Sequence, residues 1–530
     1  MGHANTGVAA FGLLIAALAL AGLSRKLRVS APVVLVVAGI VVSFVPHLPN
    51  YTLRPDIVLA LFLPPLLYSA SLESSLIGFR QNLRAIGSLS VGLVLATTVA
   101  VGFATHLVFP ARPLPAAFAL GAIVAPPDAV AAAAIGRELG LPRRLLRILG
   151  GESLVNDATA LTVYRVALAA ATGSGVTLLG GVGMFLLAAI GGVGVGLVAG
   201  YAFQFVRERI GESVIENAFS LITPFAAYFV AEQIHASGVL AVVITGLYLG
   251  HHEAKTSYAA RLEARALWRM ADFLLESVVF LLIGLQLPTV IRGLSKYSVS
   301  TVLWTTGVVL AIVILIRIVW VYPFTYGPRW LSPRIRSHEP PPTWQGVAVV
   351  SWAGMRGVVS LAAAFALPES FPGRPLILFI TFAVVLGTLV LQGFTLPWLI
   401  RTLDVKAGDE EYKDRLSEAS AQHRAANAAI ERLDSIVAEE EPGPPPEVVD
   451  RLRAMTEFRR NGAWERLGGA SGADGGETPS AAFRRVRQNL ISAERDVFLA
   501  LRDEGRLDDD VLRQIVYELD LEEAMLDWRN

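Results

Sequence analysis

The chain of 530 residues contains no cysteine, so disulfide bonds and thiolate metal sites are excluded. Charged residues are also scarce, at 17%, whereas hydrophobic residues make up 54%. A soluble globular protein needs a polar surface, and this composition provides too few polar side chains to cover one. The surplus of apolar residues therefore indicates a protein whose main solvent is lipid.

The formal net charge of zero conceals an asymmetry along the chain. Residues 1–403 contain 27 basic and 16 acidic residues, whereas residues 404–530 contain 18 basic and 29 acidic ones. The first part therefore carries a net charge of +11 and the second a net charge of −11. We interpret these parts as two domains, a transmembrane domain over 1–403 and a soluble tail over 404–530.

Thirteen apolar segments approach the roughly 20 residues that an α-helix needs to cross the hydrocarbon core of a bilayer. They lie at 8–24, 30–46, 54–71, 85–109, 114–136, 145–171, 177–206, 214–234, 236–250, 267–291, 299–325, 345–368 and 375–400. Two of them, 30–46 and 236–250, are short, so the predicted number of spans is about thirteen. This pattern predicts an all-α polytopic membrane protein.

The basic residues between these segments predict an orientation. If the N-terminus lies outside, the loops inside contain 19 Lys and Arg residues and the loops outside contain five. Cytoplasmic loops are enriched in Lys and Arg, so we expect a multi-pass protein of the cell membrane with an external N-terminus and a cytoplasmic tail. Because the first basic residues follow the first apolar segment, we expect that segment to be a retained helix and not a cleaved signal peptide.

Charged residues within or near the predicted spans are candidates for function, because a charge at membrane depth is costly unless it faces a cavity or a partner. These residues are Asp128, Glu152, Asp157, Arg165, Glu232, Asp272, Glu276, Arg317 and Arg356. For Arg165, Glu232, Asp272 and Arg317, a structural ion pair or snorkelling to the interface is the favoured explanation.

The densest group of polar residues lies in the fifth and sixth spans. Pro126 and Pro127 have no backbone N–H, so two carbonyl groups one turn earlier lose their helical donors and the fifth span is expected to break there. Asp128 lies about 14 residues before the turn between the two spans, and Asp157 about 15 residues after it. At about 1.5 Å per residue, both carboxyl groups are expected near the middle of the bilayer.

Oxygen ligands at this depth suit a small alkali cation, and the site lacks the His and Cys that a transition metal prefers. Ser153 shares a helix face with Asp157, and Glu152 shares the adjacent face with Asn156. We predict a site that exchanges an alkali cation for H⁺, formed by Asp157, Asp128, Ser153 and Asn156. A buried carboxylate needs a proton or a cation as its partner, so the two compete for it. The alternative is a purely structural role, in which Asp157 and Asn156 only hydrogen-bond neighbouring helices.

The twelfth span contains a matching break at Gly354 and Gly357, with Arg356 between them. If the seventh span is a spacer, the first six and the last six spans have opposite orientations, and the broken span is the fifth in each set. An inverted-repeat transporter has this arrangement. Arg356 needs a partner at this depth, and Glu152 lies off the face predicted to bind ions. We therefore predict a structural ion pair between Glu152 and Arg356.

Two other classes of function fit parts of the pattern. Ser153 could be taken as the nucleophile of an intramembrane hydrolase, but His106 and His235 lie at the outer ends of their spans, out of reach as a base. A cation channel is the second alternative, although paired carboxylates at broken helices suit exchange better than a selectivity filter. We expect a transporter and not an enzyme, with no cofactor beyond the transported ions and no nucleic-acid partner.

These motifs resemble those of the monovalent cation/proton antiporters, specifically the electroneutral sodium/proton exchanger branch of bacterial type. The matching stretches are Phe-Leu-Pro-Pro-Leu-Leu-Tyr at 62–68, the Pro-Pro-Asp break ending at Asp128, Gly-Glu-Ser-Leu-Val-Asn-Asp at 151–157, Phe-Leu-Leu-Ile-Gly-Leu at 280–285 and Trp-Ala-Gly-Met-Arg-Gly at 352–357. The resemblance implies exchange of Na⁺ or Li⁺ for H⁺ in pH and sodium homeostasis, a homodimer, and an inverted-repeat core whose two broken helices cross at mid-membrane. It assigns ion binding to Asp157 and Asp128, and Asn156 resembles the electroneutral members.

Two departures from the family pattern affect the ion site. Pro127 stands where many members have a threonine ligand, and Ser69 stands where many have a glutamate. They leave the cation preference open, so K⁺/H⁺ exchange by the same fold is the main alternative. The tail reads as amphipathic helices interrupted at 442–446 and 468–476, which indicates a helical cytoplasmic domain with a regulatory or dimer-supporting role.

Overall fold

The computed structural model describes residues 12, 15–22, 24, 26, 31–44, 58–110, 113–172, 178–295, 297–338, 341–406, 408–439, 443–465, 477–504, 506–507 and 509–527. The chain divides into two compact units, Met1–Lys406 and Ala407–Asn530. This division falls three residues after the boundary that the charge distribution predicts. All regular elements of the described residues are helical.

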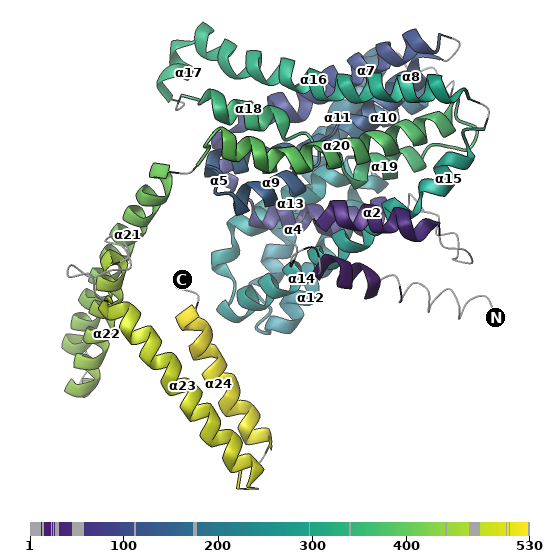
Figure 1. Ribbon diagram of the computed structural model, residues 1–530. Helices are drawn as coiled ribbons and strands as arrows, with labels where there is room; N and C mark the ends of the chain where they lie inside the picture. The colour runs from purple at the N-terminus through teal and green to yellow at the C-terminus, as the bar shows by residue number, and fades with distance from the viewer. Residues whose placement is uncertain are drawn as a thin grey trace. The chain divides into compact units, whose positions relative to one another are not determined.

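The first unit is a bundle of long helices (Figure 1). Its elements are α2 Ala31–Ser43, the π-helix η1 Val58–Phe62, α4 Leu63–Glu73, α5 Leu76–Gln81, α6 Leu83–Gly87, the π-helix η2 Ser88–Leu93, α7 Val94–Val108, α8 Leu114–Val124, α9 Ala129–Glu138, α10 Arg143–Ala171, α11 Leu178–Arg207, α12 Ser213–Gln233, α13 Gly238–His251, the 3-10 helix η3 Glu253–Lys255, α14 Tyr258–Leu285, α15 Leu287–Arg292, α16 Val299–Leu331, α17 Pro333–His338, α18 Trp344–Trp352, α19 Val358–Phe365 and α20 Arg374–Thr402.

Each predicted span from the second to the thirteenth coincides with one or more of these elements, and residues 15–22 of the first span are also helical. Among the described residues, six helices are long and apolar enough to cross a membrane by length and composition. Large apolar side chains on α11 face outward, with Leu187 63% and Ile190 70% exposed. Lipid stabilises such a surface and water does not, so the unit is a multi-pass membrane domain.

Small residues allow some helices of this unit to pack very closely. Helix α2 lies against α14, and Gly39 of α2 faces Gly284 of α14. A Cβ atom added at either glycine would overlap the backbone of the opposite helix. The two helices therefore depend on glycine at this crossing, as membrane helices often do because close backbone approach replaces the hydrophobic effect as a driving force.

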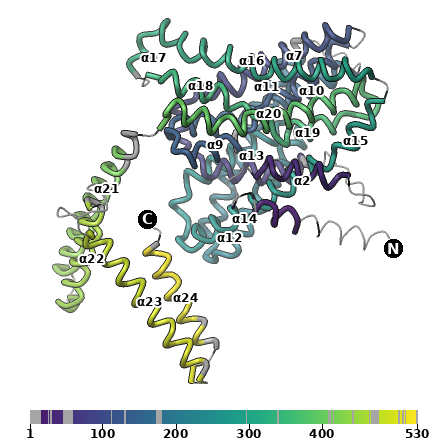
Figure 2. The backbone as a smooth tube through the Cα atoms, viewed as in Figure 1, coloured from purple at the N-terminus to yellow at the C-terminus, as the bar shows by residue number. Residues whose placement is uncertain are grey.

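The second unit consists of α21 Gly408–Glu439, α22 Pro446–Glu465, α23 Pro479–Asp503 and α24 Asp509–Asp527. Helix α21 pairs with α22, and α23 pairs with α24, which gives two helical hairpins (Figure 2). Arg487 of α23 forms a two-pronged ion pair with Glu522 of α24, at 2.6 and 2.7 Å. The predicted helical tail is therefore present. The predicted interruption at 468–476 lies outside the described residues.

Candidate ion-binding site

Two broken helices form the centre of the candidate site. The fifth span is interrupted between α8 and α9, where Pro126 and Pro127 cannot donate backbone hydrogen bonds. The twelfth span is interrupted between α18 and α19, over residues 353–357. Both interruptions fall where the sequence predicts them.

The two interruptions lie against each other. The backbone N–H of Asp128 donates a hydrogen bond of 2.7 Å to the carbonyl oxygen of Met355. The Asp128 carboxylate lies against Gly357, the residue that precedes α19, and a Cβ atom at position 357 would overlap it. Gly357 has an extended backbone, so it is required here for space and not for an unusual conformation. Asp128 therefore places its carboxyl group at the N-terminus of α19, where the helix dipole favours a negative charge.

Arg356 lies in the interruption between α18 and α19 and binds the carbonyl groups at the end of α8. Its side chain is 1% exposed. Its Nε donates to the carbonyl of Val124 at 3.0 Å and one terminal nitrogen donates to the carbonyl of Ala125 at 3.2 Å. The other terminal nitrogen donates to the carbonyl of Gly354. A guanidinium group thus satisfies carbonyls that the proline break leaves without helical donors, at the negative end of α8.

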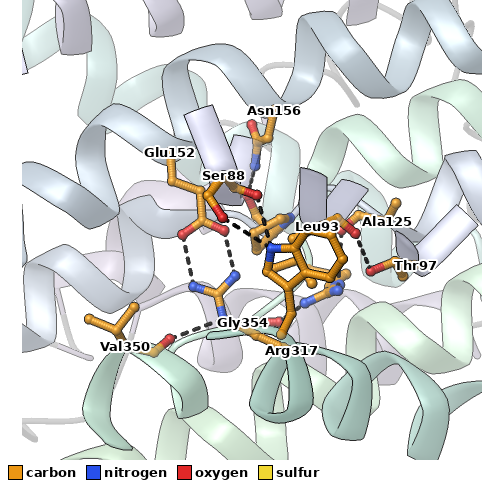
Figure 3. Close-up of polar contacts among 12 residues, drawn as sticks. Ser88, Leu93, Thr97, Ala125, Glu152, Asn156, Arg317, Val350 and Gly354 are labelled. Atoms are coloured by element: carbon orange, nitrogen blue, oxygen red, sulfur yellow. Dashed lines mark hydrogen bonds and ion pairs between the residues drawn. The ribbon is translucent and has the colours of Figure 1, made fainter. Parts of the chain in front are cut away.

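The predicted ion pair between Glu152 and Arg356 is wrong. Glu152 of α10 instead pairs with Arg317 of α16, through two bonds of 2.5 and 2.8 Å (Figure 3). The two side chains are 0% and 1% exposed. The Nε of Arg317 also donates to the carbonyl of Val350 at 3.0 Å, so Arg317 ties α10 to the end of α18. The partners of Arg356 are backbone carbonyl groups and not the predicted Glu152 carboxylate.

The sequence identifies Arg317 only as a charge within a span, with a structural ion pair or snorkelling to the interface as the favoured explanation. That explanation is correct, and so is the one for Arg165, which pairs with Glu232 at 2.8 Å. Spacing along a helix shows which face carries a residue, but it does not show which of two arginines on other helices reaches that face. The choice between Arg317 and Arg356 therefore needed the three-dimensional packing.

A cavity of about 440 Å³ reaches three of the predicted ion ligands, Asp128, Ser153 and Asp157. Asp157 is 7% exposed, and it is near enough to Asp128 for the two carboxyl groups to interact electrostatically. The cavity also reaches Arg143 at the start of α10. Asp157 follows Arg143 by 14 residues, so the cavity extends about 21 Å along this helix.

Asn156, the fourth predicted ligand, contacts the proline break. It does not line the cavity, and its side-chain amide donates a 2.6 Å hydrogen bond to the carbonyl of Pro127. The amide oxygen is buried without a hydrogen-bond partner among the described residues. Asn156 therefore joins α10 to the proline break, and its role as an ion ligand stays a prediction.

Three further residues of the cavity wall were not predicted as ligands. Ser360 of α19 is 1% exposed, and its hydroxyl has no hydrogen-bond partner among the described residues. Ser69 of α4 donates a hydrogen bond to Asp272 of α14, and both line the cavity. The sequence drew attention to Ser69 and Asp272 separately, but not to their contact across 203 residues.

The donors around Asp157 are carboxylate and hydroxyl oxygens. The described residues contain no group of three or more His, Cys, Asp or Glu side chains arranged to hold a metal ion. Two carboxyl groups and a hydroxyl suit a weakly held alkali cation better than a tightly held divalent one. The chemistry of these oxygen atoms therefore fits the predicted alkali-cation site.

A sequence model for the family described as sodium/hydrogen exchanger, transmembrane, matches residues 13–402. An uncharacterized Na⁺/H⁺ exchanger of Mycobacterium tuberculosis is 35% identical over 523 residues, which cover 95% of this chain and 93% of that protein. The Na⁺/H⁺ antiporter ApNhaP of Aphanothece halophytica is 31% identical, with 76% of this chain and 75% of that protein covered.

A sodium, potassium, lithium and rubidium/H⁺ antiporter of Bacillus subtilis is 31% identical, with 70% of this chain and 58% of that protein covered. The solved structure of the sodium proton antiporter MjNhaP1 from Methanocaldococcus jannaschii matches with a TM-score of 0.62 at 18% identity, over 74% of this chain and 98% of that chain. That likeness confirms the predicted fold class. The predicted family is also confirmed: the chain belongs to the transmembrane sodium/hydrogen exchanger family.

Proposed function

We propose that the chain is a secondary active transporter that exchanges Na⁺ or Li⁺ for H⁺, with Asp157 as the group that binds either ion. The observation that carries this proposal is the cavity that leads to Asp157, Asp128 and Ser153. A desolvated carboxylate is costly without a partner, so a cation and a proton compete for it. Alternating access of this one group to the two sides of the membrane then couples the two fluxes. Two of the similar proteins are named as Na⁺/H⁺ antiporters, which supports the same assignment.

The cavity of this conformation opens to the cytoplasm in the proposed orientation. Its wall contains Arg137 at the end of α9 and Arg143 and Arg147 at the start of α10. These residues belong to a loop that the positive-inside rule assigns to the cytoplasm. The same rule supports an external N-terminus, a cytoplasmic tail and residence in the cell membrane.

We propose one H⁺ per cation. Asp128 lies at the N-terminus of α19, where the helix dipole and free amide groups favour its ionised form throughout the cycle. Asp157 is then the carboxyl group that alternates between a proton and a cation. Asn156 is neutral and contributes no further proton. Exchange is therefore electroneutral and serves to set internal pH and Na⁺.

Exchange of K⁺ for H⁺ is the second candidate. The Bacillus subtilis relative is named as an antiporter of sodium, potassium, lithium and rubidium. Oxygen donors that hold a cation weakly do not by themselves separate Na⁺ from K⁺. The transport experiment therefore adds each cation in turn.

Everted membrane vesicles with a pH-sensitive dye test the exchange. After a proton gradient is formed, Na⁺ or Li⁺ should restore the dye fluorescence, and a response to K⁺ alone would overturn the sodium assignment. The Asp157→Asn variant should give no response, because an amide neither releases a proton nor carries negative charge. The matched control is Glu369→Gln, which removes an exposed carboxyl group away from the cavity and should behave as the wild type. Residual coupled exchange in Asp157→Asn would reject Asp157 as the carrier.

Current measurements on proteoliposomes test the stoichiometry. A jump in Na⁺ concentration on proteoliposomes adsorbed to a solid-supported membrane should translocate no net charge if one H⁺ leaves for each Na⁺. A sustained Na⁺-dependent current that disappears in Asp157→Asn would mean that Asp128 also exchanges its proton.

We propose a homodimer on the basis of the family resemblance. Native mass spectrometry of the purified protein should give twice the chain mass of 56.7 kDa. A species of the single chain mass alone, with transport retained after reconstitution, would contradict it.

A further inference from the structure

A second polar cluster lies on the wall of the same cavity. Ser69 and Glu73 are one turn apart on α4, and Asp272 and Glu276 are one turn apart on α14. Helices α4 and α14 are in contact, and all four side chains line the cavity. Their face-to-face arrangement makes this wall acidic. The transport site described above does not include any of the four.

The Asp272 carboxylate is held in one orientation. The hydroxyl of Ser69, whose side chain is 2% exposed, donates a hydrogen bond to Oδ2 of Asp272. The other oxygen, Oδ1, is buried and has no hydrogen-bond partner among the described residues. A buried carboxylate oxygen without a partner is costly. Asp272 therefore retains unused capacity to bind a cation.

The position of this pair along the cavity follows from helix geometry. Ser69 lies four residues before Glu73, the last residue of α4, which is a distance of about 6 Å along the helix. Asp157 lies 14 residues from the start of α10, which is about 21 Å. Both helix ends contribute residues to the cavity. The pair of Ser69 and Asp272 therefore lies between the mouth of the cavity and Asp157.

Arginine residues on another part of the cavity wall also affect the path of a cation. Arg137, Arg143 and Arg147 line the cavity from α9 and α10. They repel a cation, whereas the carboxylates on α4 and α14 attract one, and a cavity with low-dielectric walls enhances both effects. A cation is therefore directed along the wall that contains Asp272.

We propose that Asp272, oriented by Ser69, is an intermediate binding station that the transported cation occupies on its way to Asp157. This inference rests on the proposed exchange at Asp157 and adds a second residue that determines apparent affinity. The simpler explanation is that the hydrogen bond between Ser69 and Asp272 only joins α4 to α14. The two explanations make different predictions. Cation binding at Asp272 needs the negative charge of its side chain, whereas the contact between the helices needs only an oxygen that accepts the hydrogen bond from Ser69.

The Asp272→Asn variant separates them, since the amide oxygen can still accept the hydrogen bond from Ser69 while the charge is lost. In everted vesicles, we expect the Na⁺ concentration for half-maximal exchange to rise about fivefold, the effect of one lost charge in a partly screened site. The maximal rate at saturating Na⁺ should stay within about twofold of the wild type, because Asp157 still carries the ions. Asp272→Glu should restore most of the affinity.

Two further variants make the result decisive. Glu263→Gln is the matched control, because Glu263 also lies on α14, pairs with Asn217 and Ser213, and does not line the cavity. It should leave the half-maximal Na⁺ concentration unchanged. Ser69→Ala removes the hydrogen bond and keeps the charge, and it should raise that concentration less than Asp272→Asn does. If Asp272→Asn does not fold, judged by its thermal transition in detergent, Ser69→Ala and Asp272→Glu carry the test.

The outcomes are distinct. An unchanged half-maximal Na⁺ concentration in Asp272→Asn, with an active wild type, overturns the station and leaves the proposed function intact. Loss of exchange at saturating Na⁺ in a stably folded Asp272→Asn also overturns it, because Asp272 would then be part of the carrier. Failure of the wild type to exchange any of the cations would instead reject the proposed function.

Discussion

Replacement of Arg317 by methionine tests the buried ion pair that holds the core of the transport domain. The substitution keeps most of the side-chain volume but leaves the Glu152 carboxylate without a counter-charge, in a position that is 0% exposed. Breaking a buried pair from one side costs about 3–5 kcal/mol. The carbonyl of Val350 also loses its donor, which costs about 1 kcal/mol more. We therefore expect a loss of about 4–6 kcal/mol in stability.

The matched double variant distinguishes a charge effect from a packing effect. Glu152→Met combined with Arg317→Met removes both charges, and such apolar replacements are often close to neutral. The double variant should therefore be more stable than either single variant. The exposed pair of Arg165 and Glu232 serves as a control, because its side chains are 46% and 28% exposed and Arg165→Met should cost about 1 kcal/mol or less.

Thermal unfolding of the purified full-length protein in detergent provides the measurement. We expect each single variant to unfold about 5–7 °C below the wild type, the shift that this loss of stability produces in a unit of this size, and the double variant to recover most of this loss. An Arg317→Met variant as stable as the wild type would refute the reasoning. So would a double variant in which the two losses simply add, because the side chains would then contribute packing and not charge compensation.

Three other predictions follow from single features. Gly357→Ala places a methyl group on the neighbouring carboxylate, so we expect a loss of about 1–3 kcal/mol in stability and a large loss of dye response in vesicles. An impermeant maleimide on intact cells should label Glu369→Cys and not Tyr517→Cys, and the reverse pattern would invert the proposed topology. Arg487 lowers the pKa of Glu522 below 4.5, so the pair stabilises the hairpin above that pH and ceases to do so as the pH falls through the lowered pKa. Arg487→Gln should therefore increase hydrogen exchange in α23 and α24 at pH 7, but not at a pH low enough to protonate Glu522.

The sequence predicts the arrangement of helices well because each property involved is local. Apolar length marks the spans, and Pro126 and Pro127 end α8 whatever surrounds them. The depth of Asp157 and Asp128 follows from residue spacing along two helices joined by a short turn. For the same reason the sequence places Ser153 on the face of α10 that carries Asp157, and the cavity reaches these three residues.

The partners of charged groups are less predictable, because they come from distant parts of the chain. Glu152 meets Arg317 across 165 residues, and Ser69 meets Asp272 across 203. No helical periodicity connects such residues. The prediction for Arg356 failed for a further reason, because it assumed that a buried arginine needs a carboxylate partner. The carbonyl oxygens at the end of a broken helix also accept hydrogen bonds from a guanidinium group.

The fixed charges near the crossing balance one another without any transported ion. Glu152 and Arg317 form a neutral pair. Arg356 compensates the carbonyl end of α8, and Asp128 compensates the amide end of α19, so each interruption supplies the charge that the other requires. The carboxyl group of Asp157 lies beside these balanced groups and lines the cavity. In the proposed cycle, the broken helices therefore keep their charge balance while Asp157 changes its partner from a proton to a cation.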